Sequence, residues 1–215
     1  MDDLGSRTLN PWVSMWTRPR ATIQQIIDAN PERAVVLLSA VAGFGQALDR
    51  ASAKNMGDKL DWPMILLFAA LLGPVAGILG LYVGGALLRW TGSWMGGQGS
   101  SRNIRAAVAW SNVPEIWAML LWVPGLALFG QELFTSKTPL IDADPARLAA
   151  FLGFAAVELV LTVWALVVFL KSLGQVQGFS AWKALGNALL AALVVIVPLA
   201  AIGIAAALVI PVLAR

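Results

Sequence analysis

The sequence predicts an all-α protein, an integral membrane bundle of five transmembrane helices with a short amphipathic helix near the N-terminus. Of the 215 residues, 59% are hydrophobic and only 13% are charged, whereas a soluble domain carries about 25% charged residues. Apolar runs longer than 20 residues recur along the chain, and short charged joints separate them. Runs of that length fit a hydrocarbon core about 30 Å thick. Lipid is therefore the expected solvent for most of this chain.

Residues 1–33 form the one sizeable polar segment, which we expect to be cytoplasmic or interfacial. Isoleucines recur at helical spacing within residues 22–28 (TIQQIID), and this pattern predicts a short amphipathic helix. Two tryptophans and two arginines flank it: Trp12, Trp16, Arg18 and Arg20. We expect the rings to lie at the headgroup level and the guanidinium groups to face lipid phosphates. The alternative is a plain polar lead-in. The start, MDDLGSR, lacks the features of a cleavable secretion signal.

Residues 34–215 form the predicted transmembrane domain. The first span runs from Ala34 to about Leu48 and ends at the charged pair Asp49 and Arg50. The other four spans cover residues 63–88, 104–130, 148–170 and 184–213. In the third span, Pro114 removes a backbone hydrogen bond, so we expect a bend there.

The second span carries glycines three or four residues apart, which form one face of small residues. They are Gly73, Gly77, Gly80 and Gly84. Such a face lets another helix approach closely. The neighbour is either a helix of the same chain or a helix of a second protomer or other membrane protein.

The distribution of Lys and Arg predicts the orientation, because basic residues are retained on the cytoplasmic side. With the N-terminus inside, nine basic residues fall on the cytoplasmic side: Arg7, Arg18, Arg20, Arg33, Arg89, Arg102, Arg105, Lys171 and Lys183. Six fall outside: Arg50, Lys54, Lys59, Lys137, Arg147 and Arg215. This favours an orientation with the N-terminus in the cytoplasm and the C-terminus outside. The same residues stand singly at span ends, so no nucleic-acid-binding patch is predicted.

The amino-acid inventory excludes most enzyme mechanisms. The chain has no cysteine and no histidine, which removes disulfides, zinc sites of the usual ligand set, and Cys or His nucleophiles and bases. No aspartate lies within a predicted span, so an intramembrane aspartate protease lacks its partners. We therefore predict a protein that is not an enzyme and that has no cofactor and no metal site; its expected partners are membrane lipids.

Two carboxylates fall inside predicted spans, Glu115 in the third and Glu158 in the fourth. A charge costs several kcal/mol at such a depth, so these side chains face protein or water. Both lie about 15 Å deep when 1.5 Å per residue is counted from the span ends. Four polar residues lie between this level and the cytoplasmic face: Ser111, Asn112, Thr162 and Asn187. One interpretation is a shared polar pocket; the other is that these groups bond across helices and only hold them together.

Three stretches carry a resemblance to a known family: NPWVSMWTRPRATIQQIID, GQGSSRNIRAAVAWSNVPEIW and LGQVQGFSAWKALGNALL. Together they resemble the Yip family of Ypt-interacting membrane proteins, in its bacterial branch, over roughly residues 10–213. The matching positions are Pro19, Ser111, Pro114, Gly178 and Lys183. The resemblance implies a five-span fold with a cytoplasmic N-terminus, and its bacterial branch implies a bacterial inner membrane. Eukaryotic members act in membrane traffic and bind lipid-modified Rab-type GTPases and one another. Here the long cytoplasmic region of many members is reduced to about 33 residues, which argues against GTPase docking.

Two functional hypotheses follow. The first is a non-enzymatic membrane scaffold or adaptor that acts through helix faces and its interfacial N-terminal helix. The second is a small transporter, channel or lipid-handling protein that uses Glu115 and Glu158 near the midplane. A water-accessible crevice that reaches Glu115 favours the second hypothesis, whereas carboxylates sealed against neighbouring side chains favour the first.

Overall fold

The computed structural model describes residues 8–213, which form helices joined by short turns, with no strand in that range. In chain order the elements are α1 (Pro11–Thr17), α2 (Pro19–Ala29), α3 (Val35–Ala53), η1 (Met56–Asp58), α4 (Trp62–Trp94), α5 (Ser101–Ser111), α6 (Val113–Ala118), η2 (Met119–Leu121), α7 (Trp122–Phe129), η3 (Gly130–Phe134), α8 (Pro139–Ala143), α9 (Pro145–Gln177) and α10 (Ala181–Leu213). Six of the α-helices carry proline in the first turn, where its missing N–H costs no helical hydrogen bond.

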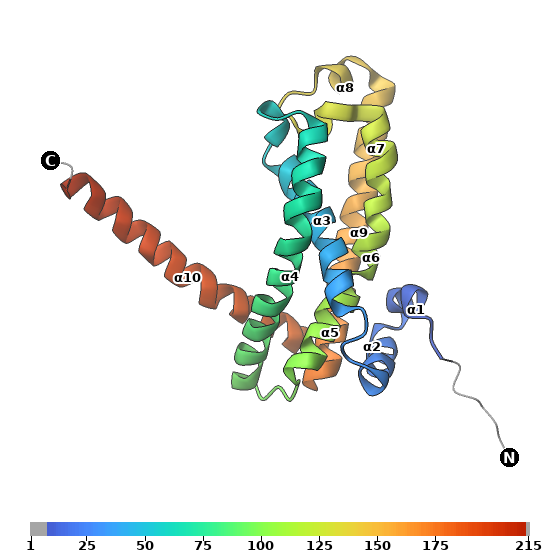
Figure 1. Ribbon diagram of the computed structural model, residues 1–215, viewed down its shortest axis with the longest axis vertical. Coiled ribbons are helices and arrows are strands. Elements are labelled where there is room, and N and C mark those ends of the chain that lie inside the picture. The colour runs from blue at the N-terminus through green and yellow to red at the C-terminus, as the bar shows by residue number, and fades with distance from the viewer. Residues whose placement is uncertain (1–7, 214–215) are drawn as a thin grey trace.

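The chain passes back and forth between two ends of the molecule (Figure 1). α3 leads from the lower half to the upper end and α4 returns, α5 to α7 run upward together, and α9 returns to the lower end, where α10 begins. The joints predicted to be cytoplasmic therefore share one end, and the joints predicted to be outside share the other. Arg7 and Arg215 of the charge count lie outside the described residues.

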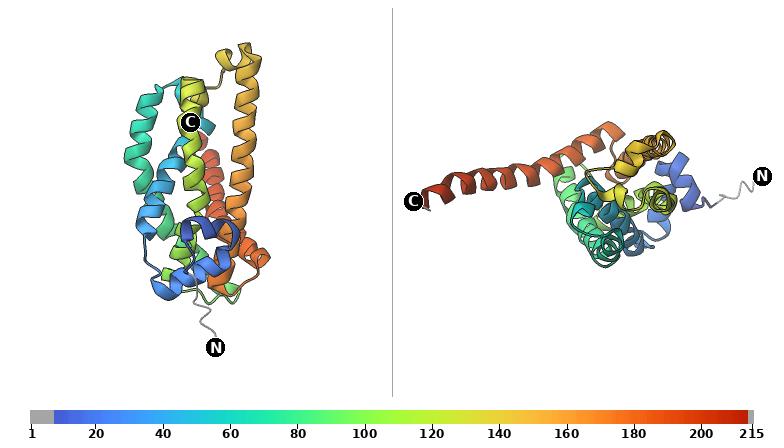
Figure 2. Two further views of the ribbon diagram at one scale, coloured as in Figure 1. Left: turned by 90° about the vertical axis from the view of Figure 1, so that its right-hand side faces the viewer. Right: turned by 90° about the horizontal axis from the view of Figure 1, so that it is seen from above.

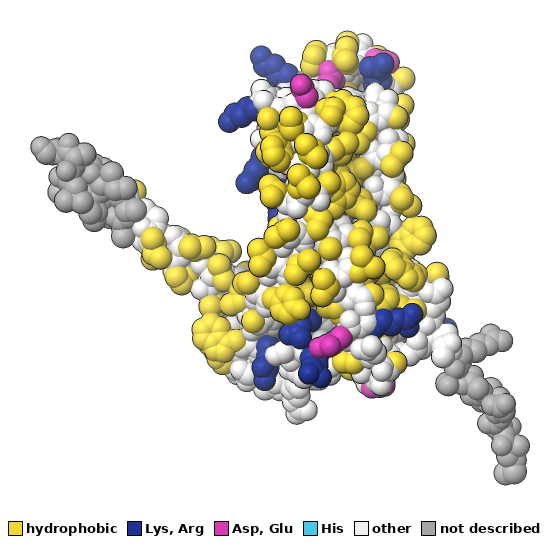
Figure 3. Space-filling view, in the orientation of Figure 1, with side chains coloured by type: hydrophobic (Ala, Val, Ile, Leu, Met, Phe, Trp, Pro, Cys, Tyr) yellow, Lys and Arg dark blue, Asp and Glu magenta, His cyan; other side chains and the backbone are white. Residues whose placement is uncertain are grey.

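Four helical stretches within residues 8–213 are long and apolar enough to cross a membrane: Trp62–Trp94, Ser101–Phe134, Pro145–Gln177 and Ala181–Ile204. The prediction of an all-α, multi-pass membrane protein is confirmed. The first predicted span falls in α3, which has 19 residues and is not among the four, because its C-terminal half carries Gln46, Asp49 and Arg50. Apolar side chains cover the middle of the molecule, and Lys, Arg, Asp and Glu gather toward its two ends (Figure 3).

The third predicted span is not one continuous helix. α5 ends at Ser111, and α6 begins at Val113 with Pro114 in its first turn. The interruption at Asn112 agrees with the bend expected from the proline, since a helix does not readily continue through the residues before it. As a result, α6 and α7 follow a different line from α5, and all three helices pack against α9 (Figure 1).

α3 and α4 touch through glycines. A Cβ atom on Gly43 would lie 2.7 Å from the Cα of Gly77, and a Cβ on Gly73 would lie 2.7 Å from the carbonyl oxygen of Gly43. Both separations are too short for real Cβ contacts, so only glycine permits this approach. Of the predicted glycine face, Gly73 and Gly77 thus meet a helix of the same chain, whereas Gly80 and Gly84 have no neighbour within 4 Å in the described chain.

The N-terminal helices α1 and α2 form a hairpin on the lower half of the bundle (Figure 1). Ile23 and Ile26 of α2 are 0% and 4% exposed and belong to the main apolar core, together with Ile104 of α5 and Leu173 of α9. The isoleucine face therefore packs on protein rather than on lipid. A short amphipathic pattern does not distinguish the two cases, because lipid and a protein core are both apolar.

Hydrogen bonds between polar side chains and the backbone join the lower ends of α4, α9 and α10. The side-chain amides of Gln177 and Asn187 each donate to the carbonyl oxygen of Leu88, both at 3.1 Å. Thr91 Oγ1 donates to Asn187 Oδ1 at 2.7 Å, and the backbone N–H of Gly99 donates to Gln177 Oε1 at 3.2 Å. Because every amide in this cluster has partners, it holds helices together rather than offering a free site.

The upper end is closed by hydrogen bonds between the joints. Gln131 Nε2 donates to the carbonyl oxygens of Gly57 and Leu60, at 2.7 and 2.9 Å. The buried carboxylate of Glu132 accepts the backbone N–H groups of Leu140 and Ile141. The Asp58 carboxylate accepts the backbone N–H of Ser136 at 3.0 Å, and this hydrogen bond holds the pKa of Asp58 below its usual value.

The helix α10 departs from the bundle. Its first turns pack on α4 and α9, and the rest extends away to one side (Figure 2). Large apolar side chains along this part are exposed, among them Leu193, Ile196, Leu199 and Ile202. In a membrane protein such a surface is covered by lipid or by another helix.

The glycine contact gives a testable consequence. A Cβ at Gly77 would lie 2.8 Å from the Cα of Gly43, so we expect Gly77→Ala to force α3 and α4 apart and to lower the free energy of unfolding by about 1–3 kcal/mol. Gly80→Ala, on the same helix but in open space, is the matched control, with a change within about 0.5 kcal/mol. Thermal and denaturant unfolding in detergent, followed by far-UV circular dichroism, measures both. Equal effects of the two variants would contradict the close contact.

Candidate functional site

A cleft of about 500 Å³ lies between α3, the α6–α7 segment and α9. Each element contributes a stripe of residues at helical spacing. On α3 the stripe includes Ala42, Gln46, Asp49 and Ala53, which recur every three or four residues. The α6–α7 segment contributes residues from Glu115 to Phe129, and α9 contributes residues from Phe151 to Thr162. The cleft is therefore a gap between three packed helices, not a surface irregularity.

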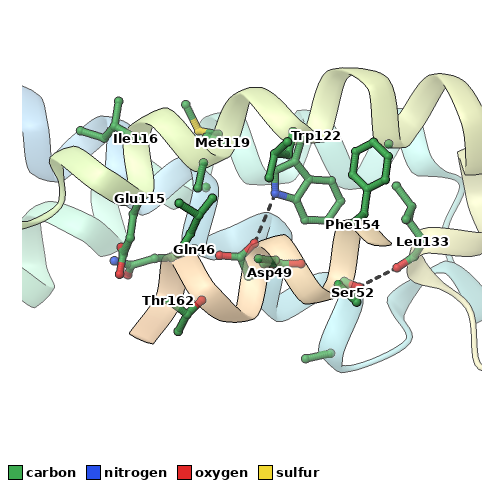
Figure 4. Close-up of a pocket in the computed structure, with 18 of the residues that line it drawn as sticks. Gln46, Asp49, Ser52, Glu115, Ile116, Met119, Trp122, Leu133, Phe154 and Thr162 are labelled. Atoms are coloured by element: carbon green, nitrogen blue, oxygen red, sulfur yellow. Dashed lines mark hydrogen bonds between the residues drawn. The ribbon is translucent and has the colours of Figure 1, made fainter. Parts of the chain in front are cut away.

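Polar groups from all three elements meet in the cleft. They are Gln46, Asp49, Ser52, Glu115, Glu158 and Thr162. Figure 4 shows the amide of Gln46 beside the carboxylate of Glu115, with Asp49 one turn farther along α3 and Thr162 on the facing helix. The side chains of Asp49, Glu115 and Glu158 are exposed to the cleft rather than sealed by neighbours. Three carboxylates thus face one open space inside the bundle.

Aromatic side chains line the other part of the cleft. Phe129 of α7 makes edge contacts with Phe151 and Phe154 of α9, with ring centroids 5.6 and 5.9 Å apart. Trp122 stacks on Phe134 at 5.3 Å, and its Nε1 donates to Asp49 Oδ1 at 3.3 Å (Figure 4). These contacts fix the rings, so the apolar wall is a defined surface rather than a mobile one.

The charge of the lining has one sign. Among the described residues that line the cleft, three are acidic and none is Lys or Arg. Carboxylates at this depth of a membrane protein are stabilised by protons, bound cations or hydrogen-bond donors. Trp122 and Gln46 supply donors near Asp49 and Glu115. Beyond these donors, the carboxylate oxygens suit a positively charged ligand or a proton as a further partner.

The structure brings together part of the predicted polar set. Glu115, Glu158 and Thr162 line the cleft. Ser111 is buried, and its Oγ donates to the carbonyl oxygen of Val108 at 2.8 Å. Asn112 lies at the break between α5 and α6. Neither Ser111 nor Asn112 lines the cleft.

Asn187 belongs to the separate cluster around Leu88 and Thr91. Of the six residues considered for a shared polar pocket, three therefore line the cleft and Ser111, Asn112 and Asn187 lie elsewhere. The depth of a residue in the membrane does not reveal the side of the helix on which it lies.

Gln46 and Asp49 are not among the polar residues predicted from the sequence. The first span is predicted to end at Leu48 because an Asp–Arg pair usually marks a membrane boundary, whereas α3 continues to Ala53. A signal was present nevertheless: Gln46 and Asp49 stand three residues apart, which places them on one face of a helix. That face is the one turned toward Glu115 and Glu158.

The predicted interfacial residues have different surroundings. Trp12 is 41% exposed and meets Trp110 edge to face, with ring centroids 6.1 Å apart. Trp16 is partly buried. The Arg20 guanidinium donates to Gln175 Oε1 and to the carbonyl oxygen of Phe179, whereas Arg18 is exposed. Trp12 and Arg18 are thus open to the surroundings, while Arg20 fastens the hairpin to α9.

Comparison with known protein families gives one match, to the Yip1 domain, over residues 13–202. Comparisons with curated proteins and with solved structures give no significant match. The matched region includes most of the hairpin, the whole cleft and the larger part of α10. The chain therefore belongs to the Yip1 domain family.

Proposed function

We propose that this chain is a non-enzymatic, multi-pass membrane protein of the Yip type, from the bacterial branch, that binds a proton or a cationic ligand in its intramembrane cleft and moves it or exchanges it with the bilayer. The observation that carries the proposal is the cleft itself. It is about 500 Å³ in volume and reaches Glu115, Glu158 and Asp49. Carboxylates that served only to hold helices together would be sealed by neighbouring side chains, as Gln177 and Asn187 are.

The proposal includes five membrane crossings, with α3 as the first. Its 19 residues give a length of about 28 Å, close to a hydrocarbon core of about 30 Å. The polar residues Gln46 and Asp49 face the cleft rather than lipid, which lowers the cost of inserting this helix. Residues 34–215 then form the membrane domain.

The N-terminal segment, residues 1–33, is proposed to rest at the cytoplasmic surface of a bacterial inner membrane. Its described part packs on the lower end of the bundle, one of the two ends at which basic residues gather (Figure 3). Trp12 and Arg18 are exposed there and suit the headgroup region. In this orientation the C-terminus lies outside the cell.

A second candidate function is the scaffold or adaptor, and the position of α10 favours it. Beyond its first turns α10 exposes apolar side chains to its surroundings, and Gly80 and Gly84 of α4 are open to close approach. Another membrane protein or a second protomer would find two unpartnered helix surfaces there. The two functions require different regions, so variants in the cleft distinguish them.

The topology is testable because the chain contains no cysteine. We expect a membrane-impermeant maleimide added to intact cells to label Asn55→Cys and Lys137→Cys, and to label Ala21→Cys and Gln98→Cys only after permeabilisation. All four positions are exposed, so differences in labelling between them report the side of the membrane and not burial of the side chain. Labelling of Ala21→Cys and Asn55→Cys from the same side would show that α3 does not cross. A complete inversion of the pattern would reverse the orientation but keep the five crossings.

Flux through purified protein in liposomes tests the function. We expect movement of protons, alkali cations or cationic solutes across the liposome membrane. Glu115→Gln and Glu158→Gln should each lower the rate of this movement at least about tenfold. That factor corresponds to a loss of about 1.4 kcal/mol in the free energy of cation binding. Asp61→Asn is the control, because this exposed acid lies outside the cleft and caps no helix through its side chain in the described chain. If none of these solutes and no lipid moves, the ligand-handling function is wrong and the adaptor function remains.

A further inference from the structure

The geometry points to an organic cation with an apolar body, such as a lipophilic ammonium or phosphonium compound, as the ligand of the cleft. This inference rests on the proposed function and names the class of its ligand. It depends on three properties of the cleft: its size, the separation of its polar and aromatic parts, and the single sign of its charged residues.

The size of the cleft fits an organic molecule. Binding sites for small organic ligands usually enclose about 300–1,000 Å³, and this cleft encloses about 500 Å³. A bare metal ion needs several ligands within bonding distance. Among residues 8–213, no group of three His, Cys, Asp or Glu side chains comes close enough to hold one. The carboxylates are spread around a space rather than gathered around a point.

The lining changes character along the cleft. Figure 4 shows Glu115, Gln46 and Thr162 toward one end, Phe154 and Leu133 toward the other, and Asp49 with Trp122 between them. A ligand with a charged head and an apolar body would place the head beside Glu115 and the body against Phe154. Aromatic faces also attract organic cations directly, so the ring of Trp122 beside Asp49 suits a cation that is not strongly hydrated.

The sign of the charge excludes most membrane lipids. A phospholipid carries a phosphate, and a buried phosphate requires Arg, Lys or backbone N–H donors. None of the described residues that line the cleft is Arg or Lys, so a phosphate would lie against carboxylates. A simple cation without an anionic group meets no such repulsion.

The helices that form the cleft also face the bilayer. They expose large apolar side chains, Val123 and Leu128 on α7 and Leu152 and Leu159 on α9. These surfaces contact lipid in a membrane. An amphipathic cation that has partitioned into the bilayer is thereby concentrated next to the helices of the cleft.

Small residues keep the cleft open, and they provide a matched pair of variants. Ala155 of α9 lines the cleft between Phe154 and Glu158, whereas Ala156, the next residue, is exposed and does not line it. Ala155→Leu would fill the space that the ligand body occupies. Ala156→Leu adds the same side chain to the outer surface of the same helix and leaves the cleft unchanged.

Binding of radiolabelled tetraphenylphosphonium to the purified full-length protein in nanodiscs tests the inference. We expect saturable binding that dodecylammonium displaces and dodecanol does not, because dodecanol lacks the charge. Glu115→Gln, Glu158→Gln and Ala155→Leu should each weaken binding at least about tenfold, or about 1.4 kcal/mol. Ala156→Leu and Asp61→Asn should leave the affinity within about twofold of the unsubstituted chain, a difference of about 0.4 kcal/mol. Helix content and gel-filtration profiles identify any variant that fails to fold.

The other outcomes separate this inference from the proposed function. Proton or alkali-cation flux that depends on Glu115, without tetraphenylphosphonium binding, would overturn the organic cation and keep the function. Exchange of a fluorescent phosphatidylethanolamine that depends on Glu115 would overturn the exclusion of phosphate and make a lipid the ligand. The absence of binding and of every flux would remove both.

Discussion

The close contact between α3 and α4 is the constraint on which the rest of the bundle depends. Gly43 meets Gly73 and Gly77 at a distance that no Cβ would permit, and this contact fixes both the position and the rotation of α3. The neighbouring face of α3, which carries Gln46 and Asp49, is then turned toward α6 and α9. A different helix rotation would expose an aspartate to lipid, at a cost of several kcal/mol. Glycine packing and the acidic cleft are thus parts of one arrangement.

The bundle separates two kinds of polar group. Gln177, Asn187 and Thr91 are buried and fully paired at the lower end, where they join three helices. Asp49, Glu115 and Glu158 instead face a space large enough for a ligand. In a membrane an unpaired polar group is costly, so the open carboxylates indicate a use that the paired amides do not have. The break at Asn112 contributes to this separation, because α6 and α7 leave the line of α5 and form one wall of the cleft.

Individual residues show where inference from the sequence succeeds and where it fails. Glu115, Glu158 and Thr162, which the sequence places inside apolar spans, all line the cleft, since a charge inside an apolar run must find a polar neighbour. Asn187 was grouped with them by depth and lies elsewhere. Ile23 and Ile26 lie in α2 and pack on a protein core, which their spacing in the sequence does not distinguish from lipid. Asp49 was taken for the end of a span and lies inside α3. Each error concerns which surface a residue meets.

By itself, the sequence determined that lipid surrounds most of this chain and that the chain is helical. It also determined the four long membrane helices and the presence of carboxylates within them. These properties follow from composition and from the length of apolar runs. Only the tertiary structure decided which helix faces meet, that α3 brings Gln46 and Asp49 to Glu115 and Glu158, and that α10 departs from the bundle. The physical reason is that the apolar pattern of a membrane helix is nearly uniform around its axis. Helix rotation is then set by contacts between residues distant in the chain, which no local pattern specifies.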